Sequence, residues 1–222
     1  MILTSEYLEK SFEIKEQRLN TIVLENKIYY RKIIQAVRDT INLDLKEFVL
    51  YEDEEEVKLN KVAELITNVF NINPNDNKIL AKLYEKLGQE ITYEDIYCYN
   101  RNFKSALSKL LEELSMLSEY DFKYEDVDYK YIFKSVGLEI DTKFTGLMAN
   151  IIEYLDISHK LLNKKIFFIV GIDDYFEERE LYDLNEYLCY NDIIVVCLQN
   201  RLDRDLLPNE NLRIIDEDLG EI

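Results

Sequence analysis

The chain has 222 residues, of which 47% are hydrophobic and 32% charged, a composition typical of globular domains. Its formal net charge of −18 predicts a surface that on average repels nucleic acids and anionic membranes. The single histidine, His159, nearly excludes a histidine-based metal site or catalytic triad. Three cysteines without metal-site spacing, no secretory signal and no apolar run long enough to span a membrane predict a cytoplasmic protein.

The first part of the chain alternates strand and helix signals. Asn20–Asn26 is a β-branched apolar run, and Lys27–Ile41 has apolar residues at helical spacing. Lys46–Leu59 resembles a strand interrupted by five consecutive acids, Glu52–Glu56. We interpret these acids as a solvated edge that blocks unwanted strand pairing, with a metal site as the alternative.

The middle of the chain is predicted to be helical. Helices are expected over Lys61–Phe70, Asn77–Ile91 and Tyr93–Ser118, the last with an apolar face that includes Phe103 and Leu114. Three successive helices without intervening strands indicate an extended α-helical leg rather than more sheet. We predict this inserted leg over residues 60–136.

Strand and helix signals alternate again towards the C-terminus. The expected elements are a helix at 129–136, a strand at 138–141, a helix at 144–162, a strand at 165–172, a helix at 177–190 and strands at 192–200 and 212–216. Uninterrupted Ile, Val and Phe runs are typical of parallel strands covered on both faces. The sequence therefore predicts an α/β head with a mainly parallel sheet, formed by residues 1–59 and 137–222.

The strand over Lys165–Ile172 ends in Asp173 and Asp174, as in the second acidic motif of nucleotide-hydrolysing sheets. Such proteins also need a G-x-x-x-x-G-K-[ST] loop to hold phosphates, and the five glycines of this chain are too far apart to build one. The pair could bind a metal in a metal-dependent phosphodiesterase or NTPase. We favour the alternative that both acids cap the helix that follows.

Three predicted helices carry cations on one face, in a chain that is otherwise acidic. The cations are Lys27, Arg31 and Arg38 on the first helix, Lys78, Lys82 and Lys86 on the second, and Arg101, Lys104 and Lys109 on the third. Each face alone is typical of an ordinary solvated helix. Their joint occurrence predicts a basic surface suited to sequence-independent phosphate contacts.

The segment 119–128 is strongly acidic. Calcium prefers six to eight oxygen ligands, which clustered carboxylates at a junction could supply. The spacing is not that of an EF-hand, and a solvated acidic linker is the alternative. The carboxylates in question are Glu119, Asp121, Glu125, Asp126 and Asp128.

Several ordered segments together resemble a known family. They are "TIVLEN", "FVLYEDEEEVKL", "INPNDNKILAKLYEKL", "KYIFKSVGLEID", "KIFFIVGIDDYF" and "LRIIDEDLGEI". Over essentially its full length the chain resembles the Csn-type CRISPR-associated adaptation proteins of type II-A systems.

The resemblance implies a fold like a P-loop NTPase core without the phosphate loop, plus a helical leg. It implies a non-catalytic homotetrameric ring, supported by calcium, that binds double-stranded DNA ends in a basic channel during spacer acquisition. The implied partners are the CRISPR integrase proteins and the RNA-guided nuclease of this antiviral defence system. We expect the DNA contacts among the cations above and calcium at the 119–128 acids; a protein-binding scaffold without DNA affinity remains the alternative.

Overall fold

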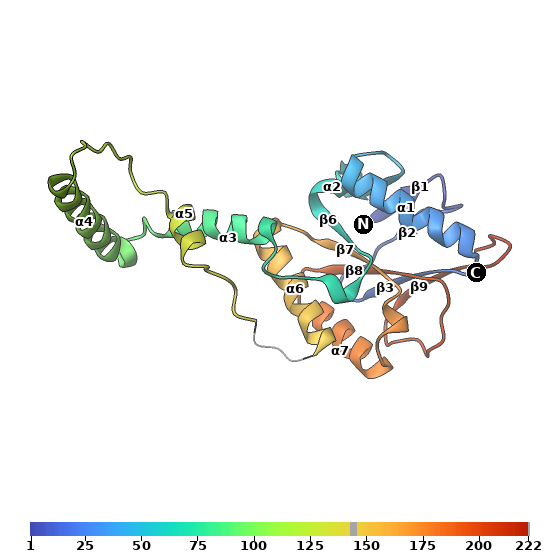
Figure 1. Cartoon of the computed structure of the whole chain (residues 1–222). Coiled ribbons are helices and arrows are strands. Elements are labelled where there is room, and N and C mark those ends of the chain that lie inside the picture. The colour runs from blue at the N-terminus through green and yellow to red at the C-terminus, as the bar shows by residue number, and fades with distance from the viewer. Residues whose placement is uncertain (143–145, 222) are drawn as a thin grey trace. The chain divides into compact units, whose positions relative to one another are not determined.

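The computed structural model describes residues 1–142 and 146–221, which form two units (Figure 1). The head unit comprises Met1–Pro74 and Thr142–Ile222, and the leg unit comprises Asn75–Asp141. The predicted boundaries at 60 and 136 therefore need correction, because residues 60–74 lie in the head unit and 137–141 in the leg unit. Within the described ranges, no helix is long and apolar enough to cross a membrane.

The head unit is built on a five-stranded parallel sheet, which confirms the predicted fold class. Its strand order is β6-β7-β8-β3-β9, and every pairing within it is parallel. Every residue of β3 and β8 is buried, as expected for strands covered on both faces. The strands are β3 (Leu19–Leu24), β6 (Ala63–Ile66), β7 (Ile166–Val170), β8 (Ile194–Gln199) and β9 (Asn211–Ile215).

Helices cover both faces of this sheet, with α1 (Lys27–Leu43) on one face and α6 (Leu147–Leu162) and α7 (Glu178–Cys189) on the other (Figure 1). Ile33 and Val37 of α1 share one apolar core with alternate strand residues. These helices confirm the predictions over 27–41 and 177–190. The helix predicted over 144–162 begins at Leu147; positions 144 and 145 lie outside the described residues.

A second, antiparallel sheet, which the sequence did not predict, packs on the α1 side of this core. Its order is β2-β1-β4-β5, with strands β1 (Ile2–Ser5), β2 (Phe12–Glu13), β4 (Phe48–Glu52) and β5 (Glu55–Val57). The acidic run is a hairpin: Asp53 and Glu54 form its turn, with φ of 48° and 68°. Because β5 is an edge strand with exposed acids, the edge interpretation agrees with the structure.

Two predicted elements are wrong. The helix predicted over 61–70 is instead the end of α2 (Leu59–Val62), strand β6 and the short helix η1 (Val69–Asn71). Pairing of β6 with β7 outweighs the local helical pattern and buries Ala63 completely. The segment 138–141 is not a strand, because the backbone of Ile140 bonds the side chain of Asn75 instead of a neighbouring strand.

The leg unit contains helices α3 (Asn77–Glu90), α4 (Glu94–Leu117) and α5 (Tyr129–Ser135). The packing of α3 against the segment around α5 centres on Tyr84. Its hydroxyl donates to the carbonyl of Leu138 at 2.7 Å, and its ring lies 5.8 Å from that of Phe133. By contrast, α4 has no buried residue along its 24 positions.

Candidate nucleic-acid interface

The turn between β3 and α1 lies where parallel α/β folds commonly bind phosphates, at a helix N-terminus beyond the sheet. Only Glu25 and Asn26 separate the two elements. The side-chain oxygen of Asn26 accepts hydrogen bonds from the N–H groups of Ile28 and Tyr29, each at 3.1 Å. The donors that would hold a phosphate are therefore already used within the chain.

Two further side chains, one directly after β8 and one from α1, make contacts at the same edge of the sheet. The amide of Asn200 donates to the carbonyls of Leu24 and Glu25 at 2.8 and 3.1 Å. The hydroxyl of Tyr30 donates to Leu198 at 3.2 Å, and burial raises the pKa of Tyr30 to about 12. These contacts fill the position where a nucleotide-binding sheet would hold its ligand.

Asp173 does not cap the following helix, so that interpretation of the sequence is wrong. Both aspartates lie in the short helix η2 (Ile172–Asp174), whereas Glu177 and Glu180 form the capping box of α7. Asp173 is nearly buried, and its carboxylate lies 3.1 Å from Nε of Arg204. Asp174 is 57% exposed and lies 3.9 Å from Arg201.

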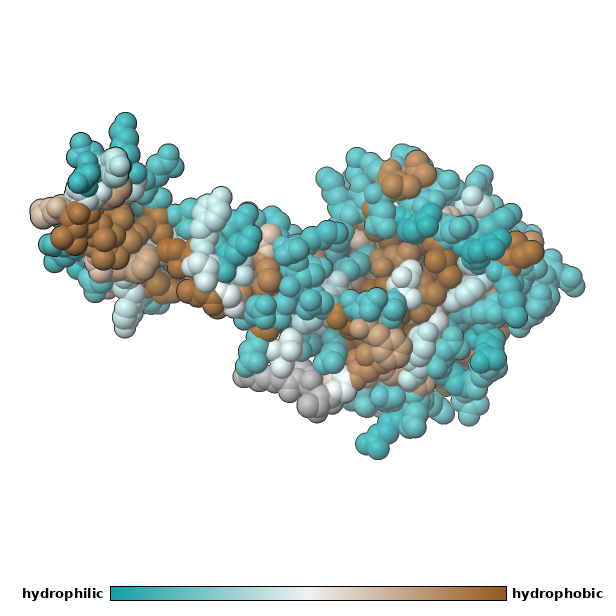
Figure 2. Space-filling model, viewed as in Figure 1, coloured by the Kyte–Doolittle hydropathy of each residue, from teal (hydrophilic) through white to brown (hydrophobic). Residues whose placement is uncertain are grey.

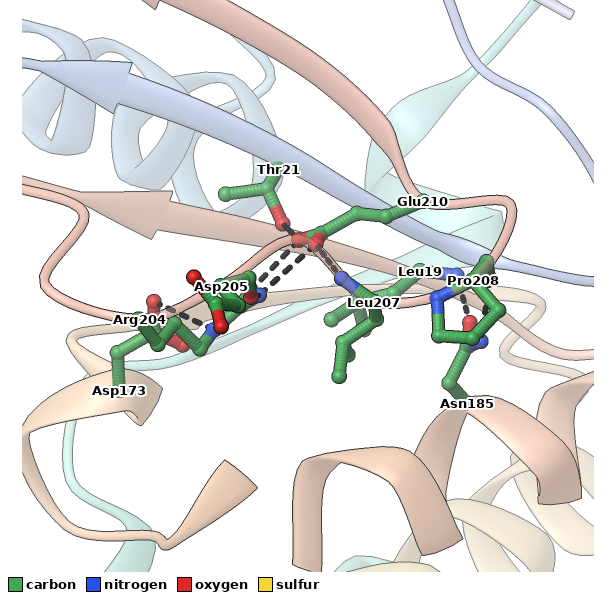
Figure 3. A network of polar contacts seen from close by, with 9 residues as sticks. All are labelled: Leu19, Thr21, Asp173, Asn185, Arg204, Asp205, Leu207, Pro208 and Glu210. Carbon is green, nitrogen blue, oxygen red and sulfur yellow. Dashed lines mark hydrogen bonds and ion pairs between the residues drawn. The ribbon is translucent and has the colours of Figure 1, made fainter. Parts of the chain in front are cut away.

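The partner of Asp173 belongs to a buried polar network beneath the loop that follows β8 (Figure 3). The guanidinium of Arg204 donates to both carboxylate oxygens of Glu210, at 2.6 and 2.8 Å. Thr21 donates its hydroxyl to the same carboxylate at 2.6 Å, and Leu207 donates its N–H at 3.0 Å. The side chains of Arg204 and Glu210 are 9% and 0% exposed.

The network shifts the pKa values of its two acids in opposite directions. Burial raises the pKa of Asp173, and the adjacent Arg204 opposes that rise. Burial also raises the pKa of Glu210, but the hydrogen bonds from Arg204 and Thr21 outweigh it and leave the pKa below its ordinary value. One aspartate is thus held in an internal ion pair and the other faces solvent, so the two do not form the free carboxylate pair that the phosphodiesterase alternative requires.

Of the cations predicted on α1, two are available to a ligand. Lys27 and Arg31 are exposed and form no ion pair within residues 1–142 and 146–221. Arg38 is also exposed, but its guanidinium lies 2.7 Å from the carboxylate of the adjacent Asp39. The narrow basic ridge predicted on this helix is therefore partly neutralised at its C-terminal end.

In the leg unit, as on α1, some of the predicted cations are paired with acids and others are not. The ammonium of Lys104 donates to both carboxylate oxygens of Asp126, at 2.7 and 2.8 Å. Lys82 lies 2.7 Å from Glu85. The predicted leg cations without an ion pair among the residues described are Lys78, Lys86, Arg101 and Lys109.

The acids predicted to bind calcium do not converge within one chain. Asp126 pairs with Lys104, and Asp128 caps α5 by accepting a hydrogen bond from the N–H of Lys130 at 2.9 Å. The other three, Glu119, Asp121 and Glu125, are exposed. Outside positions 143–145 and 222, no group of three or more His, Cys, Asp or Glu side chains could hold a metal ion. The acids of a single chain therefore do not fit calcium.

Comparisons with known proteins give the family of this chain. The family model for the CRISPR-associated protein (Cas_Csn2) matches residues 40–219. The CRISPR-associated protein Csn2 of Enterococcus faecalis is 24% identical over 220 residues, which cover 90% of this chain and 95% of that relative.

Solved structures add a likeness of fold. The crystal structure of Stu0660 of Streptococcus thermophilus superposes with a TM-score of 0.63 and 13% identity, covering all of this chain and 76% of that one. An ATP-binding protein of a putative ABC transporter from Pyrococcus furiosus reaches a TM-score of only 0.39, at 11% identity and 95% and 98% coverage, which supports no inference. On the match of the family model over most of its length, the chain belongs to the Csn2 family of CRISPR-associated proteins.

Proposed function

We propose that the protein assembles into a homotetrameric ring that binds double-stranded DNA ends without reading their sequence. It would act in the cytoplasm during spacer acquisition, alongside the integrase proteins and the RNA-guided nuclease of its CRISPR system. The proposal extends the family membership of the chain, and one structural observation carries it: the longest described helix has an apolar face that the other described residues leave uncovered.

That helix is α4, whose apolar side chains gather on the surface of the leg unit (Figure 2). Leu110, Leu114 and Leu117 are 55%, 46% and 84% exposed. Amphipathic helices owe most of their stability to packing of the apolar face, and burying one Leu side chain contributes roughly 1.5–3 kcal/mol. In the proposed ring, a second copy of the chain would cover the apolar face of α4.

Assembly would also gather the sparse cations. Each subunit offers Lys27 and Arg31 in the head unit, and Lys78, Arg101 and Lys109 in the leg unit, as exposed cations without an internal ion pair among the described residues. Closed symmetry repeats every such group around one axis, so a weak basic surface on one subunit becomes a continuous one. Contacts between these cations and phosphates would be salt-dependent and independent of sequence.

A non-catalytic role fits the head unit better than nucleotide hydrolysis. Asn26 uses the N–H groups at the start of α1, and Arg204 holds Asp173. Incubation of the protein with ATP or linear DNA and magnesium or manganese tests this part of the proposal. Turnover that Asp173→Ala abolishes would favour the phosphodiesterase or NTPase alternative.

Calcium remains part of the proposal, although one chain does not provide its site. Calcium would need oxygen ligands from separate segments or from neighbouring subunits, in addition to any that Glu119, Asp121 and Glu125 supply. Titration calorimetry measures calcium binding at protein concentrations at which the subunits are assembled and at which they are dissociated. Binding only by the assembled protein would indicate a site between subunits, and no binding at either concentration would show that there is no site.

The DNA-binding part is tested by reversing the charge of free leg cations. Because Lys104 is already paired with Asp126, Arg101→Glu with Lys109→Glu is the sharper variant. We expect at least a tenfold loss of duplex affinity at low salt, and a smaller salt dependence because fewer phosphates are contacted. The matched control, Lys46→Glu with Lys160→Glu, changes the net charge equally at cations already paired with acids. Equal losses in the two variants would contradict the assignment.

A further inference from the structure

Among the described residues of the head unit, two exposed aromatic rings lie in mutual contact. Phe70 and Tyr175 meet edge to face, with ring centroids 5.1 Å apart and planes at 81°. They are 61% and 52% exposed, although two contacting rings ordinarily bury much of their surface. Each ring follows a strand of the parallel sheet, Phe70 after β6 and Tyr175 after β7.

Buried neighbours anchor the backbone next to each ring. Phe70 lies in η1, where Val69 is 0% exposed and the N–H of Phe70 donates to the side chain of Asn68 at 2.9 Å. Tyr175 directly follows η2, where Ile172 is likewise fully buried. A buried residue thus anchors each short helix while the aromatic residue faces solvent.

The surroundings of the pair are acidic. Asp174 precedes Tyr175 and is 57% exposed. Arg201, which lies 3.9 Å from Asp174, is balanced by that carboxylate and by Asp203 at 2.7 Å. Glu177 and Glu178, two and three residues after Tyr175, line a hollow of about 660 Å³ that also contains Asp203, Asp205 and the paired cation Arg204. A phosphate brought to these rings would meet net negative charge.

We infer that Phe70, Tyr175 and Asp174 form a docking site for a cationic, arginine-bearing segment of a partner protein. Arginine side chains suit these groups, because a guanidinium stacks on aromatic faces and pairs with carboxylates. Charge complementarity distinguishes this occupant from DNA, which the adjacent acids repel. The site uses none of the cations assigned to DNA binding, so it can be tested without DNA.

The test measures binding of a fluorescein-labelled hexa-arginine peptide to the full-length protein by fluorescence anisotropy. We expect Phe70→Ala with Tyr175→Ala to weaken binding about tenfold, the range expected for loss of desolvated cation–π contacts. Asp174→Asn, which leaves both rings in place, should weaken it about threefold. The matched control, Tyr182→Ala with Tyr190→Ala, removes two exposed tyrosines of the same unit and should leave the affinity unchanged.

Three outcomes would overturn the inference. Equal affinities for the two double variants would show that the peptide binds the general acidic surface. A shift in oligomeric state on removing Phe70 and Tyr175 would show that a second copy covers the pair. Weakened binding of single-stranded DNA overhangs with unchanged peptide binding would show that the rings stack on nucleobases.

Discussion

At the scale of single residues, the buried ion pairs of Arg204 matter more for the stability of the head unit than its exposed charges do. Arg204 connects the loop after β8 to η2 through Asp173 and to the start of β9 through Glu210. Removing one partner of a buried ion pair leaves an uncompensated charge in a medium that solvates it poorly. The free energy of unfolding should therefore depend strongly on this one side chain.

Arg204→Met tests this dependence. It keeps the apolar stem but leaves the carboxylate of Glu210, 0% exposed, and that of Asp173 without a cation. We expect the free energy of unfolding at pH 7, measured by urea denaturation, to fall by about 3–5 kcal/mol. Arg201→Met, at an exposed ion pair, should change it by less than about 1 kcal/mol. Similar small losses for both variants would show that the network contributes little.

Sequence alone could not identify this network. Arg204 stands in the charged segment 201–210 among exposed residues of both signs, and no spacing rule marks it as buried. Helical period placed the cations on shared faces, but it could not show that Asp126, 22 residues away along the chain, pairs with Lys104. The availability of each cation depends on tertiary contacts that local pattern does not contain.

At the scale of elements, long apolar runs were predictable and short ones were not. The strands β3, β7 and β8 and the helices α1 and α7 follow from their periodicity, because each carries its own burial signal. The four residues of β6 look helical until β7, about 100 positions later, supplies a strand to pair with. The short strands β1 and β2 contain no apolar run as long as those of β3, β7 and β8, so the sequence did not predict them.

At this scale the prediction concerns α4, because none of its residues is buried by the described part of the chain. Leu110→Asp with Leu114→Asp should shift the protein to lower oligomers in light scattering coupled to sizing chromatography. The variant should remain folded, since neither side chain is buried. Asn102→Asp with Ser105→Asp adds the same charge on another part of α4 and should leave the mass unchanged. An unchanged mass for the leucine variant would place the subunit interface elsewhere.

At the scale of the whole molecule, the proposed function has to explain how a chain with a net charge of −18 would bind DNA, a polyanion. The proposed ring answers it by geometry, because symmetry collects the unpaired cations around a channel while most acids face outwards. Such a ring would hold a duplex by encirclement as well as by contact. A duplex without ends could not enter a closed ring.

The most direct test compares the affinity of the protein for linear duplex and for covalently closed circular duplex of the same sequence. The measurement is made with calcium and with a chelator, and with the oligomeric mass determined in each condition. We predict tetramers that retain linear DNA at least tenfold more tightly than circular DNA. Equal affinity for the two forms, or binding by a monomer, would contradict the account.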